Sequence, residues 1–264
     1  MSNDIAVSVK DIAFSYDTKE IYNGLSIDFP KDKISFIMGE NGSGKTTLLK
    51  ILCNFLQIRS GEIDVLGKNI HEYDVRGLAR AIAYVPQIIN LNNDFLVKDY
   101  IVLGRAPYIP FGSNPSESDY VKVEEYARVF AIDELLDVNF NTLSGGQKQI
   151  AAIVRAMVQE TPIIVLDEPM SALDMGKQAE FLSLILKLQK EGKTIILTSH
   201  NINHALAIKD ECEICLIHEQ TVLGFGMYTD VLSEDNITAI YGNNVRIDKS
   251  GNVIFNIHKD FSVV

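Results

Sequence analysis

Apolar residues along this chain fall into two patterns, short nearly unbroken runs and longer stretches with helical spacing. Nearly unbroken runs occur at residues 34–38, 163–166 and 194–198. Runs this apolar are typical of strands buried on both faces of a sheet. A helical period follows at residues 46–55 and again at 118–130. The pattern therefore predicts buried strands that alternate with amphipathic helices.

A glycine-rich segment joins the first of these strands to the first helix. Residues 39–46 read Gly-Glu-Asn-Gly-Ser-Gly-Lys-Thr, which fits the phosphate-loop pattern of glycine, four residues, then Gly-Lys-Thr. Glycines let successive backbone N–H groups turn inward around a polyphosphate, while Lys45 reaches the β- and γ-phosphates and the Thr46 hydroxyl ligates Mg²⁺. The alternative is a glycine-rich turn with a surface lysine, which the strand-loop-helix context disfavours.

Two adjacent carboxylates follow the apolar run at residues 163–166. Ligands of open α/β sheets bind at the carboxyl ends of strands, so Asp167 is placed where Mg²⁺ would lie. Glu168, one residue further, is placed to orient and polarise an attacking water. The alternative, a solvated acidic turn capped by Pro169, explains the charges but not their position after four apolar residues.

A third segment, Leu-Ser-Gly-Gly-Gln at residues 143–147, opens an apolar helix. Backbone N–H groups and a hydroxyl at a helix start form an anion site, which predicts a phosphate ligand. The alternative is an ordinary N-cap, in which Ser144 caps the helix and binds no ligand. The segment alone does not decide between these two interpretations.

Together, the order and spacing of these motifs resemble the nucleotide-binding subunit of ATP-binding-cassette (ABC) transporters over nearly the whole chain. The resemblance implies ATP and Mg²⁺ as cofactors and residues 143–147 as the family signature, which binds the γ-phosphate of ATP held by the other subunit of a head-to-tail dimer. The residues it implies for ATP are Gly39, Asn41, Gly42, Ser43, Gly44, Lys45, Thr46 and Thr47 of one subunit, with Ser144, Gly145, Gly146 and Gln147 of the other.

Four further positions gain a role from the resemblance. Tyr16 stacks on adenine, Gln87 touches Mg²⁺ and contacts the membrane partner, Asp174 belongs to the D-loop, and His200 is the switch histidine. Glu168, His200 and Gln87 are then the catalytic set, and Thr46, Gln87 and Asp167 the metal set. Tyr16 could instead serve only packing, Gln87 could be a plain loop residue, and His200 could be a helix cap.

The resemblance also implies the architecture. We expect an α/β fold, a P-loop NTPase (RecA-like) core with an antiparallel β subdomain and an inserted α-helical subdomain. The whole chain, 1–264, is expected to be a single ABC ATPase domain. Residues 1–87 and 161–227 would form the core with the β subdomain, 88–160 the helical subdomain and 228–264 a C-terminal extension. Within the helical part, Pro107, Pro110, Gly112 and Pro115 predict a loop.

The composition is consistent with an ATPase and argues against a protein that binds nucleic acid. The chain has 264 residues, 47% of them hydrophobic, and a formal net charge of −11. Duplex binding relies on many Lys and Arg contacts, which this acidic balance disfavours. No apolar run approaches the roughly 20 residues of a membrane span, so we expect a cytoplasmic protein that is peripheral on the inner face of the membrane through its permease. The expected partners are permease subunits, a second copy of this chain, and an extracytoplasmic substrate-binding protein.

The pair Cys212 and Cys215 has a spacing that is also found in metal and redox sites. Residues 213–217 predict a strand, however, and side chains three apart on a strand point to opposite faces. Cys53 supplies no third ligand. We therefore expect three buried, reduced thiols.

Two less specific sequence matches indicate a subfamily of ABC transporters. The segment 102–108, with Gly-Arg-Ala-Pro-Tyr, and the tail at residues 231–242 resemble importers for iron-siderophores, haem and cobalamin. The alternatives are a soluble ABC ATPase, such as one for iron–sulfur cluster assembly, or a transporter subunit for an unrelated substrate. Residues 245–258 alternate as in a hairpin with its turn at 249–252, for which the sequence indicates no function.

Overall fold

The central feature of the fold is a six-stranded sheet. A computed structural model describes residues 4–89, 94–242, 245–247 and 253–255. The sheet has the order β10-β9-β3-β8-β7-β6, in which the five strands from β9 to β6 are parallel and β10 is antiparallel to β9. Its strands are β3 (Ile34–Met38), β6 (Ile82–Val85), β7 (Ile163–Leu166), β8 (Thr194–Ser199), β9 (Cys212–His218) and β10 (Thr221–Gly226).

The three apolar runs of the sequence form β3, β7 and β8, which are inner strands of this sheet. Every residue of β3, β7 and β8 is buried. Along β3, Phe36 and Met38 belong to one hydrophobic cluster and Ile37 to the other, so each face of the sheet has its own core. The prediction that these strands are covered on both faces is therefore confirmed.

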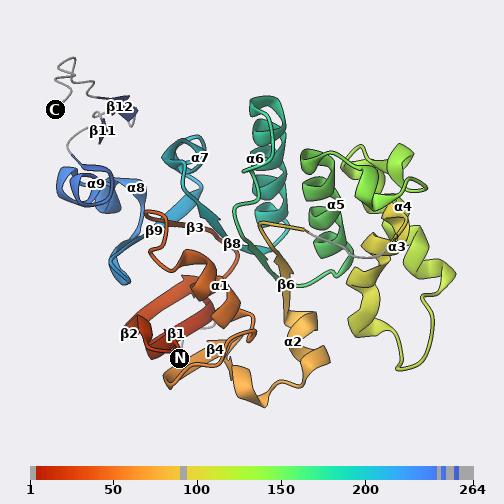
Figure 1. Cartoon of the computed structure of the whole chain (residues 1–264), viewed down its shortest axis with the longest axis horizontal. Coiled ribbons are helices and arrows are strands. Elements are labelled where there is room, and N and C mark those ends of the chain that lie inside the picture. The colour runs from red at the N-terminus through yellow and green to blue at the C-terminus, as the bar shows by residue number, and fades with distance from the viewer. Residues whose placement is uncertain (1–3, 90–93, 243–244, 248–252, 256–264) are drawn as a thin grey trace.

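A second, antiparallel sheet covers one side of the central sheet and α1, as Figure 1 shows below the central strands. Its order is β2-β1-β4-β5, and its long first strand carries Tyr16 at its end. The strands are β1 (Ile5–Tyr16), β2 (Lys19–Pro30), β4 (Ser60–Val65) and β5 (Lys68–Asn69).

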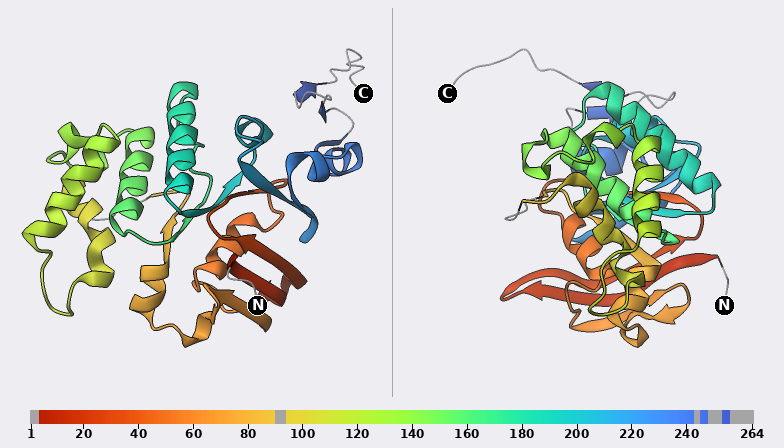
Figure 2. Two further views of the ribbon diagram at one scale, coloured as in Figure 1. Left: turned by 180° about the vertical axis from the view of Figure 1, so that it is seen from behind. Right: turned by 90° about the vertical axis from the view of Figure 1, so that its right-hand side faces the viewer.

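The helices divide into those beside the sheets and those that gather beyond β6. Elements α3 to α5 lie between β6 and β7 in the chain, and both views of Figure 2 together with Figure 1 place them as a group at one end of the molecule. The α-helices are α1 (Lys45–Leu52), α2 (Val75–Ala81), α3 (Val97–Val102), α4 (Glu117–Val129), α5 (Gly145–Val158), α6 (Met175–Lys190), α7 (Ile202–Leu206), α8 (Tyr228–Val231) and α9 (Glu234–Tyr241). Short 3₁₀ helices are η1 (Ile70–Glu72), η2 (Leu103–Tyr108), η3 (Asp133–Leu135) and η4 (Phe140–Thr142).

The predicted loop around the prolines begins later than expected. Pro107 lies inside η2, because the 3₁₀ helix continues directly from α3 and tolerates a proline near its end. Gly104 in η2 packs against α5 so closely that a Cβ there would lie 2.1 Å from the carbonyl oxygen of Arg155. The other three residues of the predicted loop, Pro110, Gly112 and Pro115, lie outside any helix or strand.

The cysteines behave as predicted. Cys212 and Cys215 lie on β9 but belong to different hydrophobic clusters, one on each face of the sheet. All three thiols are free and buried, and burial raises their pKa. Nowhere in the described ranges do three or more His, Cys, Asp or Glu side chains group so that they could hold a metal ion.

The end of the chain contains a short strand pair, β11 (Val245–Ile247) with β12 (Val253–Phe255), in antiparallel register. The predicted turn at 249–252 lies outside the described residues. In the part of the chain that the structure covers, no helix combines the length and apolar composition that crossing a bilayer requires.

Candidate active site

The carboxyl ends of β3, β7 and β8 bring the predicted polar residues together at one edge of the central sheet. Asp167 follows β7, and its Oδ1 accepts hydrogen bonds from the hydroxyl of Thr46 at 3.0 Å and from that of Thr198 at 2.8 Å. The Thr198 hydroxyl also accepts the backbone N–H of Glu168 at 2.8 Å. One threonine on β8 therefore fixes both acidic residues, whose side chains are almost fully buried.

The loop between β3 and α1 depends on glycine at two close contacts. A Cβ at Gly39 would lie 2.1 Å from the carbonyl oxygen of Ile217 on β9, and a Cβ at Gly44 would lie 2.5 Å from the hydroxyl of Tyr22 on β2. Both glycines also have positive φ, 151° and 103°. The central sheet therefore contacts the loop at Gly39 and the antiparallel sheet contacts it at Gly44. Only glycine fits at these two contacts.

Lys45 lies within this loop with its ammonium group turned inward. Its Nζ donates to the carbonyl oxygens of Gly39 and Glu40, both at 2.9 Å. Burial lowers the pKa of Lys45, although Glu168, Asp167 and Glu40 act in the opposite direction. The Lys45 ammonium group is thus partly desolvated and bound to two neutral carbonyl oxygens. Such a cation is suited to an anionic ligand, which would replace these two contacts.

The loop encloses a cavity of about 280 Å³. Six of the loop and helix residues predicted to bind ATP line it, together with Gln87 and Glu168. These lining residues are Asn41, Gly42, Gly44, Lys45, Thr46, Thr47, Gln87 and Glu168, and Ile21 of β2 completes the set. Gly39 and Ser43 belong to the same loop but do not line the cavity, and Ser43 is buried.

Glu168 is held in an unusual backbone conformation. Its φ is 46°, in the left-handed region that costs a residue with a side chain roughly 1–3 kcal/mol. Its Oε2 lies 2.9 Å from Nδ1 of His200, whose side chain is more than half exposed. The carboxylate is thus aimed by a histidine at the mouth of the cavity, an arrangement able to orient a water molecule.

The donor set beside this cavity fits a hard divalent cation. The Thr46 hydroxyl and Asp167 carboxylate are already within hydrogen-bond distance, and the side chain of Gln87 lines the same cavity. All three supply oxygen ligands, which Mg²⁺ prefers, and a phosphate ligand with water would complete the six positions. These residues could therefore hold Mg²⁺ together with a polyphosphate.

The segment at residues 143–147 does not reach this cavity within the same chain. Ser144 is the N-cap of α5 and forms a reciprocal capping box with Gln147, so the local interpretation as an N-cap is realised. Neither Ser144, Gly145, Gly146 nor Gln147 lines the cavity. The start of α5 instead lies beside the loop before α6, where a Cβ on Gly146 would be 3.2 Å from the carbonyl oxygen of Ala172.

Asp174 and Tyr16 also lie outside the cavity lining, as do Asp167 and His200, which adjoin it through Thr46 and Glu168. Asp174 is the N-cap of α6 and accepts the N–H of Lys177 at 2.9 Å. Tyr16, 42% exposed, packs edge-on against Phe14 with ring centroids 4.9 Å apart. One edge of the Tyr16 ring is thus used in packing, and much of the ring is open to a ligand.

The sequence did not reveal three residues that the structure adds to the site. Ile21 lines the cavity from β2, Thr198 holds both acidic residues, and the Tyr84 hydroxyl lies 3.4 Å from Oδ2 of Asp167. Thr198 lies two residues before His200 in the sequence, and Tyr84 lies three residues before Gln87. Their roles depend on which strands are neighbours, which no local pattern specifies.

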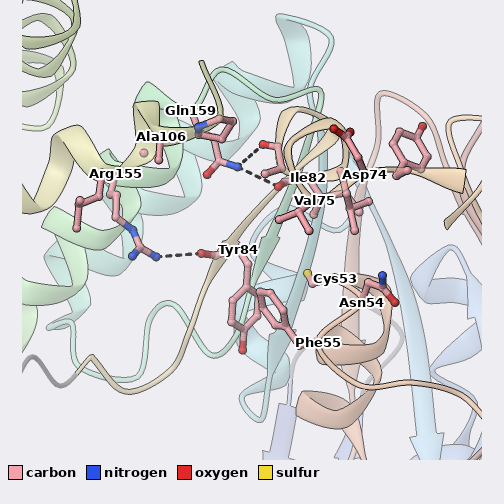
Figure 3. A pocket seen from close by; sticks show the side chains of 16 residues that line it. Cys53, Asn54, Phe55, Asp74, Val75, Ile82, Tyr84, Ala106, Arg155 and Gln159 are labelled. Carbon is pink, nitrogen blue, oxygen red and sulfur yellow. Dashed lines mark hydrogen bonds between the residues drawn. The ribbon is translucent and has the colours of Figure 1, made fainter. Parts of the chain in front are cut away.

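A groove of about 420 Å³ lies between the central sheet and the helices beyond β6. Figure 3 shows its walls, where the rings of Phe55 and Tyr84 lie together and Val75 of α2 faces in from another side. Phe55 is 61% and Val75 is 87% exposed, so the groove presents apolar surface to solvent. Gln87, to which the resemblance gives a contact with the membrane partner, lines the cavity of the phosphate loop and not this groove, whose lining includes Tyr84 three residues earlier.

The Gly-Arg-Ala-Pro-Tyr stretch forms one wall of this groove. Arg105 is buried and donates to Asp119 at 3.1 Å, to Glu160 at 2.9 Å and to the carbonyl oxygen of Val158 at 2.7 Å. Its guanidinium also stacks on Tyr108, 4.2 Å from the ring centroid. These contacts fix η2 against α4 and the end of α5, which keeps the wall in place.

Comparison with known proteins agrees with this geometry. The family model described as "ABC transporter" matches residues 22–171. The achromobactin transport ATP-binding protein of Dickeya dadantii is 32% identical over 92% of this chain and 90% of its own length. A siderophore transport system ATP-binding protein of Bacillus subtilis is 30% identical over 92% of this chain and 88% of its own. A metal-chelate type ABC transporter solved in an inward-facing conformation has a chain with TM-score 0.80 and 29% identity, covering 96% of this chain and 98% of that one.

Proposed function

The chain belongs to the ABC transporter family as an ATP-binding, ATP-hydrolysing subunit, and from this premise we propose that it energises import of a metal chelate, such as an iron-siderophore, haem or cobalamin. The observation that carries the ATPase assignment is the convergence of Lys45, Thr46 and Glu168 at one cavity, with Asp167 hydrogen-bonded to Thr46 beside it. The names of the achromobactin and siderophore transport relatives and the metal-chelate type structure support the cargo class.

In this proposal each residue of the cavity acts on bound ATP. The N–H groups of the loop and Lys45 bind the β- and γ-phosphates, Ile21 and Tyr16 lie near the base and sugar, and Thr46, Asp167 and Gln87 hold Mg²⁺. Mg²⁺ neutralises the phosphate charge that develops during transfer. Glu168, aimed by His200, orients the attacking water. Catalysis is then mostly positioning and charge stabilisation.

The second half of each site is proposed to come from another copy of the chain. Ser144 to Gln147 form the capped start of α5, a place where helix geometry favours an anion, but they lie outside the cavity of their own chain. A head-to-tail dimer would place this helix start of one copy against the γ-phosphate held by the other. ATP would then favour the closed dimer and hydrolysis would release it, which drives the attached permease.

Replacing Ser144 by arginine tests the shared site. We expect S144R to bind ATP as the parent chain does, and to lose hydrolysis by at least about 100-fold, because a bulky side chain blocks the second anion site. Steady-state phosphate release and ATP binding by equilibrium dialysis measure the two effects. The matched control is S116R, since Ser116 caps α4 with the same kind of capping box. Normal hydrolysis by S144R would contradict the dimer.

The groove of Figure 3 is the proposed docking site for the permease. Its exposed apolar residues, Phe55, Val75 and Leu103, fit the apolar face of a short amphipathic helix from a cytoplasmic loop of a membrane protein. The protein would then lie on the inner face of the membrane through this contact. An extracytoplasmic substrate-binding protein would deliver the chelate to the same permease.

Replacing Val75 by aspartate tests this docking site. Val75 is the first residue of α2 after the N-cap Asp74, where an acidic residue suits the helix dipole, so folding should be kept. We expect V75D to retain hydrolysis and to lose capture of an integral membrane permease by about 10-fold or more, since an unpaired carboxylate would be buried. Co-purification from detergent-solubilised membranes, with mass spectrometry of the captured protein, measures this.

The control for V75D is V121D, which places the same charge on the exposed side of α4, away from the lining of the groove. Equal capture by V75D and the parent chain would remove the groove from the interface. Failure of the parent chain to capture any multi-helix membrane protein would favour a soluble ABC ATPase. Uptake of labelled iron chelates, haem and cobalamin by cells lacking the chain then tests the cargo class.

A further inference from the structure

The groove and the active site meet at one side chain, that of Tyr84 on β6. Its ring lines the groove beside Phe55, with ring centroids 5.3 Å apart and planes at 76° (Figure 3). Its hydroxyl donates to Oδ2 of Asp167 at 3.4 Å. Tyr84 therefore touches both the apolar docking surface and the carboxylate assigned to Mg²⁺.

Asp167 is oriented by hydroxyl groups on both of its oxygens. Oδ1 accepts from Thr46 and Thr198, which lie within the site, and Oδ2 accepts from Tyr84. Among these three donors, Tyr84 is the one whose side chain lines the groove. A tyrosine hydroxyl ordinarily keeps its proton at neutral pH, so Tyr84 donates this hydrogen bond to the Asp167 carboxylate.

Hydrogen bonds hold the backbone around Tyr84, whereas Phe55, which contacts the Tyr84 ring, is exposed to solvent. β6 pairs in parallel with β7, the N–H of Asp167 donates to the carbonyl oxygen of Val85 at 2.9 Å, and Arg155 donates to the carbonyl oxygen of Tyr84. Phe55, by contrast, follows α1 in a turn and is 61% exposed. A helix that enters the groove and presses on Phe55 would thus move the Tyr84 ring and hydroxyl rather than the strand.

We propose that Tyr84 is a positioning residue that couples occupancy of the groove to the orientation of Asp167 and so to Mg²⁺ binding. The inference rests on the proposed nucleotide and permease sites and names a contact between them. Coupling between two sites is reciprocal, so Mg²⁺ bound at Asp167 would change the affinity of the groove for its occupant by the same factor as the occupant changes the affinity for Mg²⁺. Because Tyr84 carries the coupling in this proposal, Mg²⁺ binding should also shift the Tyr84 ring against Phe55, which is measurable on the chain alone.

The sequence contains no tryptophan, so F55W places a single fluorescent indole in the groove against Tyr84. Mg²⁺ is titrated into F55W at saturating ADP, and indole emission is recorded. We expect a saturable change in emission whose midpoint matches Mg²⁺-dependent ADP binding by equilibrium dialysis. In F55W/Y84F, which lacks only the hydroxyl, the amplitude should fall by about five-fold or more.

The matched control is F55W/Y73F. Tyr73 lines the same groove, but its hydroxyl donates to the carbonyl oxygen of Val65 at 2.9 Å, away from Asp167. This variant should keep the full emission change. In hydrolysis assays Y84F should also raise the Mg²⁺ concentration for half-maximal rate by about 10-fold, as loss of a hydrogen bond to a metal-binding carboxylate does. Y120F, which removes a hydrogen bond from a tyrosine to Asp99 outside the groove and the cavity, should leave that concentration unchanged.

The outcomes separate this inference from the function on which it rests. If dialysis shows no Mg²⁺-dependent ADP binding to the parent chain, the nucleotide site itself is wrong. If binding is normal but emission from F55W does not respond, or responds equally in F55W/Y84F, the coupling through Tyr84 is wrong and the ATPase assignment stands. An equal loss in F55W/Y73F would indicate a general disturbance of the groove and would also overturn the specific role of Tyr84.

Discussion

Substituting Glu168 with glutamine is expected to reduce ATP hydrolysis by about 10²–10⁴-fold and to leave ATP binding close to that of the parent chain. Glutamine keeps the shape of the side chain and the left-handed backbone at this position, where φ is 46°. It removes the negative charge that lies 2.9 Å from His200 and faces the cavity. The change therefore affects the water-orienting group while the phosphate loop stays intact.

The same variant should accumulate an ATP-bound dimer, because closure is favoured by ATP and release requires hydrolysis. Size-exclusion chromatography with and without ATP measures the dimer, and phosphate release measures turnover. E213Q is the control, since Glu213 is a partly buried carboxylate on β9, outside the cavity lining. Normal turnover by E168Q would assign the catalytic role to another residue.

Replacing Lys45 with alanine should weaken ATP binding by about 10–100-fold, the effect of losing one or two charged hydrogen bonds to phosphate. Lys45 is held in the loop by two carbonyl oxygens, and its pKa is lowered chiefly by burial. Its hydrogen bonds go to neutral carbonyl oxygens and removing it relieves the desolvation cost of a buried charge, which offsets the lost attraction to Glu168, Asp167 and Glu40, so thermal stability should change little. The loss is thus expected in ligand affinity rather than in folding.

Equilibrium dialysis with labelled ATP measures the affinity, and thermal unfolding followed by circular dichroism measures stability. K50A is the matched control, because Lys50 lies on the same helix α1 and does not line the cavity. If K45A binds ATP as tightly as K50A does, the assignment of residues 39–46 as the phosphate loop is wrong. A large drop in unfolding temperature for K45A would instead show that Lys45 has a structural role.

Much of the fold could be predicted because the decisive signals are local. The run at residues 163–166 is too apolar for any position but a strand covered on both faces, and β7 is fully buried. The strand-loop-helix context of the phosphate loop likewise lies within about 20 residues of sequence. For the same reason, the two-residue period of a strand was enough to predict that Cys212 and Cys215 point to opposite faces of the sheet.

The remaining contacts of the site depend on neighbours that sequence spacing does not specify. Thr198 reaches Asp167 because β8 lies beside β7, and Tyr84 reaches it because β6 lies on the other side. Gln87 alone of this segment was given a role from the sequence, yet Tyr84 lines the groove and Gln87 lines the cavity of the phosphate loop. Arg105 entered the sequence analysis only as part of a stretch that resembles certain importers, and its role in holding η2 in place became visible through its partners on α4 and at the end of α5.

The capping box at the start of α5 bears on how two copies would meet. Ser144 and Gln147 already satisfy each other in the single chain, so the backbone of the signature has its final shape before any partner arrives. Ordering a flexible side chain on association costs roughly 0.5–1.5 kcal/mol, and this segment has little such freedom left to lose. In the proposed dimer, each copy would therefore bring a half-site that is already ordered by this capping box. The speed of closure would then be governed by diffusion and by mutual repulsion between two chains of net charge −11, rather than by folding of a loop.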